Sequence, residues 1–382
     1  MNSAAWQVYL MRVINGEESG LGARLILIGL SGLELIYWML SRFQFWITRR
    51  HGLPVPVVSV GNITAGGTGK TPTVIWLVKF LKAAGFHPAI LTRGYGGTYE
   101  KEGFIFSHLN VENLSAAQTG DEPFLLAKLL PDTLIAVGRE RYQNAVKVLA
   151  LDSTVDLFVL DDGFQHWKLA RDLDIVLIDG SKPFSNRHLL PRGFLREPLS
   201  SLKRAGIILL TRTVKLSESD KNNLISELMT IHPQAFISTI AEETSELIPL
   251  TGFATGDYES RVILAVDFLK GRKVSAITGI GNPRQFLASL ENMGAEVGYF
   301  KAYPDHYHWE EAEITDLFKG LAESGFKELI ITAKDGVKLE PWTDSLHHYG
   351  LNCYILSLDF KVSDESVIQR VKDIARKQAI EN

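Results

Sequence analysis

The segment from residue 54 to residue 85 constrains the fold of this chain more than any other. PVPVVSVGN (54–62) is apolar and β-branched and is bounded by Pro and Gly, which predicts a buried parallel strand. ITAGGTGKTP (63–72) follows, and from Thr73 apolar residues recur at helical spacing until a stop at Gly85. Strand, glycine-rich loop and helix therefore come in the order that a phosphate-binding loop requires.

The residues of this loop are of the types that hold a chain of phosphates. Its glycines let backbone N–H groups turn toward a phosphate, and the following helix adds the positive end of its dipole. Lys70 can reach the β- and γ-phosphates of a nucleotide, and the Thr71 hydroxyl can bind Mg²⁺. The standard pattern has Gly where this chain has Thr64, so a glycine-rich turn with an incidental Lys is the alternative. The predicted nucleotide-binding residues are Thr64, Ala65, Gly66, Gly67, Thr68, Gly69, Lys70 and Thr71.

An acidic pair ends another apolar segment. Residues 157–160 predict a short buried strand, and Asp161 and Asp162 come directly after it. Ligands bind at the carboxyl ends of strands in open α/β sheets, so a carboxylate there can hold Mg²⁺ directly or through water. Two Asp residues before a Gly also form a simple turn, which is the alternative. A second acidic strand end, at Asp179, we interpret as structural.

The N-terminal region contains an apolar run, LILIGLSGLELIYWML (25–40), in which Glu34 is the one charged residue. The run is shorter than the roughly 20 residues that a spanning helix needs. Aromatic residues and Arg42, Arg49 and Arg50 follow it, which is typical of a helix at a bilayer interface. We interpret the segment as a helix that lies on or dips into a membrane. A helix packed on the protein, with a solvated basic end, is the alternative.

The composition of the 382-residue chain is ordinary for a soluble globular protein, with 46% apolar and 22% charged residues. Such a length predicts about two to three domains. The net charge of -4 argues against a strongly basic nucleic-acid-binding protein. The single cysteine, Cys353, excludes an internal disulfide and a cysteine-rich zinc site.

Apolar, β-branched runs alternate with helical patterns along most of the chain. This alternation predicts a doubly wound, mostly parallel sheet of the α/β class, followed by a second, smaller α/β domain. The strands of the larger sheet are expected near 56–61, 88–92, 133–137, 156–160, 174–179 and 206–211. The strands of the smaller domain are expected near 275–280, 295–301, 328–332 and 353–358, and an amphipathic helix near 364–378.

Eight motifs occur in a fixed order between about residues 57 and 338. They are VGNITAGGTGKTP, LTRGYGG, GDEP, DDGFQH, LPRGFLREP, GIGNPRQF, PDHYHW and TAKDGVK. Taken singly, most of them are typical of surface loops. Together they resemble the tetraacyldisaccharide 4'-kinase family, the membrane-associated lipid A kinases, over nearly the whole chain.

The resemblance implies an activity, cofactors and a location. The family transfers the γ-phosphate of ATP, with Mg²⁺, to the 4'-hydroxyl of a tetraacylated glucosamine disaccharide 1-phosphate, which gives a lipid A precursor. It works at the cytoplasmic face of the inner membrane of Gram-negative bacteria, so the expected partners are the acylated lipid and that membrane surface. A peripheral or monotopic attachment is expected, and neither a nucleic acid nor a protein partner is inferred. Thr64 is normal for this family.

The resemblance also implies roles for individual residues. Asp121, in GDEP, matches the carboxylate proposed as base for the sugar hydroxyl, and His306, in PDHY, matches its proposed partner. The predicted catalytic residues are Asp121, His306, Lys70, Asp161 and Asp162, and the predicted Mg²⁺ ligands are Thr71, Asp161 and Asp162. The residues expected at the substrate are Arg93, Gln165, His166, Arg192 and Arg196.

The family pattern further suggests how the chain divides. We expect a membrane-associated segment (1–50), a P-loop kinase core (51–235), a two-stranded linker (236–275) and a smaller α/β domain (276–382). Asp121 and His306 would then meet across a cleft that closes on nucleotide binding. Two other functions use the same loop: a membrane-docking P-loop ATPase switch with a protein partner, and a soluble small-molecule kinase.

Overall fold

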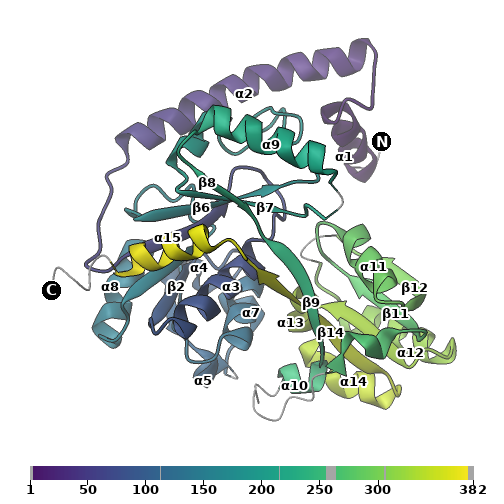
Figure 1. The fold of residues 1–382 in the computed structure, drawn as a ribbon. Helices are drawn as coiled ribbons and strands as arrows, with labels where there is room; N and C mark the ends of the chain where they lie inside the picture. Colours follow the sequence, from purple (N-terminus) through teal and green to yellow (C-terminus); the bar gives the residue numbers. More distant parts are fainter. Residues whose placement is uncertain (1–2, 112, 215, 255–263, 305–306, 377–382) are drawn as a thin grey trace. The chain divides into compact units, whose positions relative to one another are not determined.

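The computed structural model describes residues 3–111, 113–214, 216–254, 264–304 and 307–376 (Figure 1). The chain forms two compact units, each built from separated stretches of sequence. The first unit comprises Met1–Lys70, Asp162–Ala241 and Val362–Asn382. The second unit comprises Thr71–Asp161 and Glu242–Lys361.

The first unit contains a parallel run of strands. Its strands lie in the order β1, β6, β7, β8, and every ladder between them is parallel. Their bounds are Val57–Asn62 (β1), Leu173–Asp179 (β6), Ile207–Thr211 (β7) and Phe236–Thr239 (β8). All residues of β1 and β7 are buried, as expected of strands that are covered on both faces.

Helices cover both faces of these strands. They are α1 (Ser3–Ile14), α2 (Leu21–Ile47), η1 (Leu199–Arg204), α9 (Glu218–Ile231) and α15 (Glu365–Arg376). Helices α2 and α9 lie on one side of the strands and α15 on the other (Figure 1). Leu224 and Leu228 of α9 join Val176 and Leu210 of the strands in one core. Helix α15 buries Val367, Val371, Ile374 and Ala375, which recur at helical spacing.

Helix α2 is longer than the apolar run that predicts it. It has 27 residues, which span about 40 Å at 1.5 Å per residue, enough to cross a membrane by length and composition. Of its residues, all of which the structure describes, Ala23 alone is buried. Its exposed large apolar residues are Leu21, Leu25, Ile28, Leu33, Leu35, Ile36, Trp38, Met39, Leu40, Phe43, Trp46 and Ile47.

The opposite side of α2 is held by polar contacts to the loop 188–198. Glu34 accepts a hydrogen bond from the backbone N–H of Leu189 at 2.8 Å. The Tyr37 hydroxyl donates to the backbone carbonyl of Arg196 at 2.9 Å. Further along, the Phe45 ring meets the Trp167 ring edge-on, with 5.2 Å between centroids. Positions 34, 37 and 45 lie on one helix face, so the apolar residues on the other side stay in solvent.

The second unit contains two groups of strands. In the first group the order is β3, β4, β2, β5, with β3 antiparallel to its neighbour and the other ladders parallel. Its strands are β2 (Pro88–Thr92), β3 (Phe104–Phe106), β4 (Ile135–Val137) and β5 (Leu157–Asp161). Its helices are α3 (Lys70–Ala83), α4 (Tyr99–Glu102), α5 (His108–Val111), α6 (Ala116–Thr119), α7 (Asp121–Leu129) and α8 (Arg141–Leu151).

The second group is a six-stranded sheet with the order β10, β9, β14, β13, β11, β12. Its strands are β9 (Ala241–Pro249), β10 (Leu264–Ala265), β11 (Lys273–Thr278), β12 (Glu296–Ala302), β13 (Glu328–Thr332) and β14 (Asn352–Lys361). Its helices are α10 (Leu250–Ala254), η2 (Val266–Leu269), α11 (Pro283–Asn292), α12 (Glu311–Glu323), α13 (Ala333–Leu339), η3 (Glu340–Trp342) and α14 (Thr343–His348). The ladders β11–β12, β11–β13 and β13–β14 are parallel.

The predicted α/β fold class is confirmed, and each predicted strand is present within about two residues of its expected position. Strand β9 was not expected, because AEETSELIP is too polar to resemble a buried strand. The predicted four-part division of the chain stays a prediction.

Candidate active site

The glycine-rich loop lies where β1 ends in the first unit. Gly66 and Gly69 have φ values of 118° and 88°, a conformation that glycine adopts without strain. A Cβ atom added at Gly66 or Gly67 would meet nothing within 4 Å among the described residues. The loop therefore turns through positive-φ glycines around open space, as a phosphate cradle does.

Asn62, at the end of β1, is hydrogen-bonded to this loop. Its buried side-chain amide donates to the Thr68 hydroxyl oxygen at 2.9 Å. The sequence prediction did not assign Asn62 a role, although it belongs to the VGN part of the motif. An amide side chain directly before a glycine-rich loop is the sequence signal from which a role for Asn62 could have been predicted.

The acidic turn after β5 passes close over β1. A Cβ on Gly61 would lie 2.7 Å from the Phe164 Cβ, so only glycine leaves room for this crossing. Asp162 adopts φ 47°, a left-handed conformation that Asp tolerates better than most residues. Its carboxylate Oδ1 lies 3.6 Å from the Lys70 Nζ. The close crossing thus brings the predicted acid to the predicted P-loop lysine.

The loop 188–198 brings a second cation to the same carboxylate. It is joined to the glycine loop by two backbone hydrogen bonds, Ala65 N–H to Phe194 O at 2.6 Å and Arg196 N–H to Ile63 O at 2.7 Å. Arg196 Nη1 then lies 2.9 Å from Asp162 Oδ2. Burial alone would raise the pKa of Asp162, but Lys70 and Arg196 outweigh it and hold that pKa below its ordinary value. Asp162 is therefore a carboxylate anion at neutral pH.

Gln165 lies beside this cluster and is held by its amide group. It donates to the Asn62 carbonyl and to the Glu197 carboxylate, each at 2.9 Å. Glu197 in turn accepts two hydrogen bonds from Arg204, at 2.8 and 2.9 Å. The sequence prediction did not assign Glu197 a role, although it is part of LPRGFLREP. These contacts make Gln165 a brace between the strand end and the loop 188–198.

Two other residues expected at the substrate lie at the edges of this cluster. The backbone carbonyl of His166 accepts a hydrogen bond from Arg171 at 2.7 Å. The guanidinium of Arg192 lies 3.8 Å from the Glu34 carboxylate of α2. Arg192 therefore faces the N-terminal helix, whereas Arg196 faces the acidic turn.

In the second unit, Asp161 is the last residue of β5, Arg93 follows β2, and Thr71 lies in the first turn of α3. Asp161 Oδ2 accepts a hydrogen bond from the Thr92 hydroxyl at 3.0 Å, and both residues are buried. Thr71 is buried in the first turn of α3. Arg93 Nε lies 2.7 Å from a carboxylate oxygen of Glu100, which fixes this half-exposed arginine at the end of β2.

Asp121 is the first residue of α7, where the positive end of the helix dipole stabilises a carboxylate. Its Oδ2 lies 3.3 Å from the Nζ of Lys338, and both side chains are at most 10% exposed. Lys338 belongs to the TAKDGVK motif, but its role was not predicted. His306 lies outside the described residues, so its predicted pairing with Asp121 stays a prediction.

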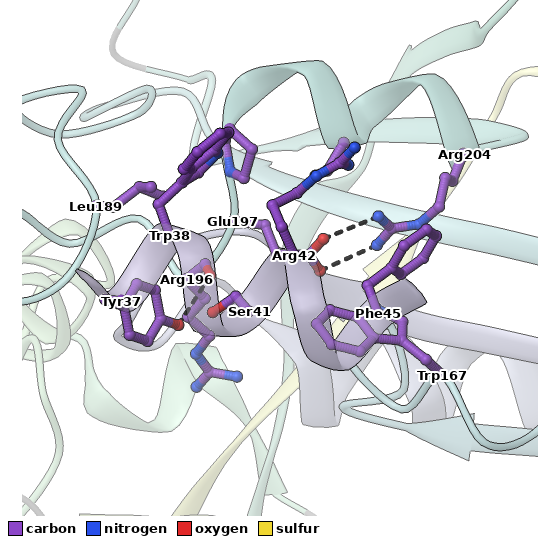
Figure 2. Close-up of a pocket in the computed structure, with 12 residues that line it drawn as sticks. Tyr37, Trp38, Ser41, Arg42, Phe45, Trp167, Leu189, Arg196, Glu197 and Arg204 are labelled. Atoms are coloured by element: carbon purple, nitrogen blue, oxygen red, sulfur yellow. Dashed lines mark hydrogen bonds and ion pairs between the residues drawn. The ribbon is translucent and has the colours of Figure 1, made fainter. Parts of the chain in front are cut away.

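A pocket lies between the second half of α2 and the loop that carries Arg196 (Figure 2). Aromatic walls and basic groups share its lining, and the Glu197–Arg204 ion pair closes one side (Figure 2). The lining residues are Tyr37, Trp38, Ser41, Arg42, Phe45, Trp167, Leu189, Arg196, Glu197, Pro198, Ser201 and Arg204. Because Arg196 also contacts Asp162, the pocket and the glycine-loop cluster share a side chain.

The residues present fit a Mg²⁺–nucleotide complex by their chemistry. A Thr hydroxyl and Asp carboxylates are the hard oxygen donors that Mg²⁺ takes together with phosphate oxygens, and Thr71, Asp161 and Asp162 supply them. The open space in front of Gly66 and Gly67 suits a phosphate. That Thr71, Asp161 and Asp162 bind one ion together stays a prediction.

A glycine loop at a parallel strand end, with its lysine, its acid and a second cation, defines a P-loop phosphotransferase. The sequence profile described as Tetraacyldisaccharide-1-P 4'-kinase matches residues 25–376. The chain belongs to this kinase family.

Individual relatives agree with this assignment. The chain is 35% identical over 345 residues to the tetraacyldisaccharide 4'-kinase of Pelobacter propionicus, covering 89% of this chain and 90% of that protein. It is 34% identical over 369 residues to the tetraacyldisaccharide 4'-kinase of Geobacter sulfurreducens, covering 95% and 97%. Among solved structures, "apo" form LpxK from Aquifex aeolicus in complex with ATP matches with a TM-score of 0.70 and 30% identity, covering 91% of this chain and 99% of that one.

Proposed function

We propose that this protein transfers the γ-phosphate of ATP to the 4'-hydroxyl of a tetraacylated glucosamine disaccharide 1-phosphate at the cytoplasmic face of the inner membrane. One observation carries the proposal: a P-loop cluster and a long helix with an exposed apolar face belong to the same unit. A helix with an exposed apolar face brings an enzyme to a lipid surface, which an acylated acceptor requires and a water-soluble acceptor does not.

In this reaction the acceptor oxygen forms a bond to the γ-phosphorus while the bond from that phosphorus to the bridging oxygen breaks and ADP leaves. Lys70 neutralises charge on the phosphate chain, and Arg196 is placed to assist from the other side of Asp162. Asp121 orients the sugar hydroxyl and accepts its proton. When bound by Thr71, Asp161 and Asp162, Mg²⁺ supplies further neutralisation of phosphate charge.

The exposed face of α2 supports attachment to a lipid surface. Twelve large apolar residues of this helix are exposed, which is far more than a soluble surface helix normally leaves in water. Arg42 lies in the last turns of the helix and Arg49 and Arg50 follow its end, and these cations favour anionic headgroups. The aromatic and basic pocket of Figure 2 opens beside this helix, so we expect it to receive part of the lipid.

The decisive experiment supplies the full-length protein with labelled ATP and the tetraacyl disaccharide 1-phosphate in mixed micelles. We expect the label on the lipid. The deacylated disaccharide 1-phosphate is the matched control and should be a poor acceptor. Phosphate release without labelled lipid would indicate the ATPase switch, and equal labelling of the deacylated compound would indicate the soluble kinase.

Charges on the exposed face of α2 should release the protein from vesicles. In the double variant Leu40→Glu, Phe43→Glu, two side chains that are 63% and 60% exposed become acidic. Because each apolar side chain contributes about 1.5–3 kcal/mol on burial, co-sedimentation with anionic phospholipid vesicles should weaken at least about tenfold. The control Leu109→Glu, Leu151→Glu alters residues of similar exposure on α5 and α8 and should bind normally. Equal binding of both variants would contradict attachment through α2.

A further inference from the structure

Lys338 is a buried cation whose ammonium group ends at the carboxylate of Asp121. Its side chain is 5% exposed, that of Asp121 is 10% exposed, and 3.3 Å separate Nζ and Oδ2. Removing a lysine and an aspartate from water is costly, and replacing such pairs by apolar residues is often neutral for stability. A contribution to folding stability alone is therefore a weak explanation for the presence of this ion pair.

Asp335 lies less than one helical turn before Lys338 in α13, and its hydrogen bonds fix the start of this helix. The Asp335 carboxylate is fully buried and accepts hydrogen bonds from the Thr278 hydroxyl and the Gly279 N–H, each at 2.9 Å. It also accepts from the Thr332 hydroxyl at 2.6 Å, while Thr332 caps the helix. These bonds tie the start of α13 to the end of β11, so Lys338 projects from a rigid support.

Two other ion pairs join α7 to the same segment and do not involve Asp121. Lys334 pairs with Glu122, and Lys128 Nζ lies 2.9 Å from Glu340 Oε1. Lys128 is 1% exposed and Glu340 is 21% exposed, so this cation is at least as buried as Lys338 although its carboxylate partner is more exposed. The docking of α7 against residues 333–342 thus has other sources, and what distinguishes Lys338 is the carboxylate it touches.

We propose that Lys338 is a positioning residue for phosphoryl transfer, which holds the Asp121 carboxylate in one orientation toward the acceptor hydroxyl. A fixed ion-pair contact at Oδ2 restricts rotation of the carboxylate group, and a well-oriented group is more effective in the transfer step. This inference rests on the proposed function, in which Asp121 accepts the proton of the sugar hydroxyl.

The test compares Lys338→Met with Lys128→Met in the full-length protein, using the lipid phosphorylation assay. Lys338→Met should lower kcat about 30- to 100-fold while the KM for ATP stays within about threefold, because the lost interaction belongs to the transfer step. Lys128→Met removes an equally buried cation from α7 and should lower the melting temperature, yet keep kcat within about threefold. A purely structural role would affect both variants alike.

Two further variants complete the test. In Asp121→Asn, Lys338→Met, the second change should cost no additional kcat, because the two residues act as one unit. Lys338→Arg keeps the positive charge but changes the shape of the side chain. Its kcat should lie between those of wild type and Lys338→Met. If Lys338→Met does not fold, the Lys338→Arg variant tests the proposal instead. A kcat equal to that of wild type in Lys338→Arg would overturn the proposal.

The outcomes separate this inference from the proposed function. If wild type labels the lipid and Asp121→Asn does not, but Lys338→Met keeps kcat within threefold, the positioning role is wrong and the kinase function stands. Equal losses of kcat in Lys338→Met and Lys128→Met also overturn the positioning role. If wild type labels no lipid, the proposed function itself fails, whatever Lys338 does.

Discussion

Replacing Lys70 with alanine is expected to lower kcat for lipid phosphorylation by about 10²–10³-fold or more, with the fold intact. Lys70 is the first residue of α3 and points its ammonium group toward the turn that carries Asp162. Without it, charge on the transferring phosphate loses its nearest cation on the loop. Arg196 remains 2.9 Å from Asp162, so that carboxylate keeps a partner and the local structure should persist.

Lys79→Ala is the matched control, because it removes a lysine from the same helix. Lys79 pairs with Asp359 at 3.2 Å, and both side chains are about half exposed. Such exposed pairs contribute about 0–1 kcal/mol, so both kcat and the melting temperature should stay near wild type. Circular dichroism and thermal unfolding establish that both variants are folded. A Lys70→Ala enzyme with more than about a tenth of wild-type kcat would contradict the role of Lys70 at the phosphates.

The sequence predicted the strands of this fold well, and the reason is physical. Parallel strands that are buried on both faces favour runs rich in β-branched and aliphatic residues, such as IILLT in β7 and the valines of β1. Strand β9 escaped prediction because its sequence, AEETSELIP, lacks that signature. Its place between β10 and β14 is set by tertiary pairing, which local sequence does not encode.

The chemistry of the site was predictable only in part. The glycine loop, Lys70 and the acidic pair follow from local order along the chain, since a strand end must place them together. The contacts that hold them do not follow, because they join segments far apart in sequence. Arg196 was predicted as a substrate residue, but its contact with Asp162 depends on how two loops that are distant in sequence meet. The contact of Lys338 with Asp121 likewise depends on how α13 docks on α7.

The described contacts also connect α2 to the glycine-loop cluster within one unit. Tyr37 of α2 donates to the Arg196 carbonyl, and the Arg196 side chain pairs with Asp162, which lies beside Lys70. Glu34 fixes the start of the same loop through the Leu189 N–H. The helix that we expect at the membrane therefore positions a residue of the phosphate cluster by direct contact, in addition to anchoring the enzyme.

Replacing Asp121 with asparagine is expected to lower transfer by about 10²–10⁴-fold while ATP still binds. The amide has nearly the shape of the carboxylate, but it cannot take up the proton of the sugar hydroxyl and does not pair with Lys338 as an anion. Asp121 begins α7 and is not part of the glycine loop of residues 64–71, so ATP affinity should stay within about threefold. Formation of labelled lipid measures the rate of transfer, and equilibrium binding of ATP measures the affinity.

Glu340→Gln is the matched control for this variant. It removes a carboxylate from the other buried ion pair of α7, that of Lys128, and leaves Asp121 in place. Because Lys128 is 1% exposed and loses the carboxylate it pairs with, the melting temperature of this variant should fall, but kcat should stay within about threefold of wild type. If Asp121→Asn and Glu340→Gln lost activity equally, the loss would reflect the docking of α7. If Asp121→Asn kept near-normal transfer, another group would have to accept the proton, and the acceptor site would have to be sought elsewhere than at the start of α7.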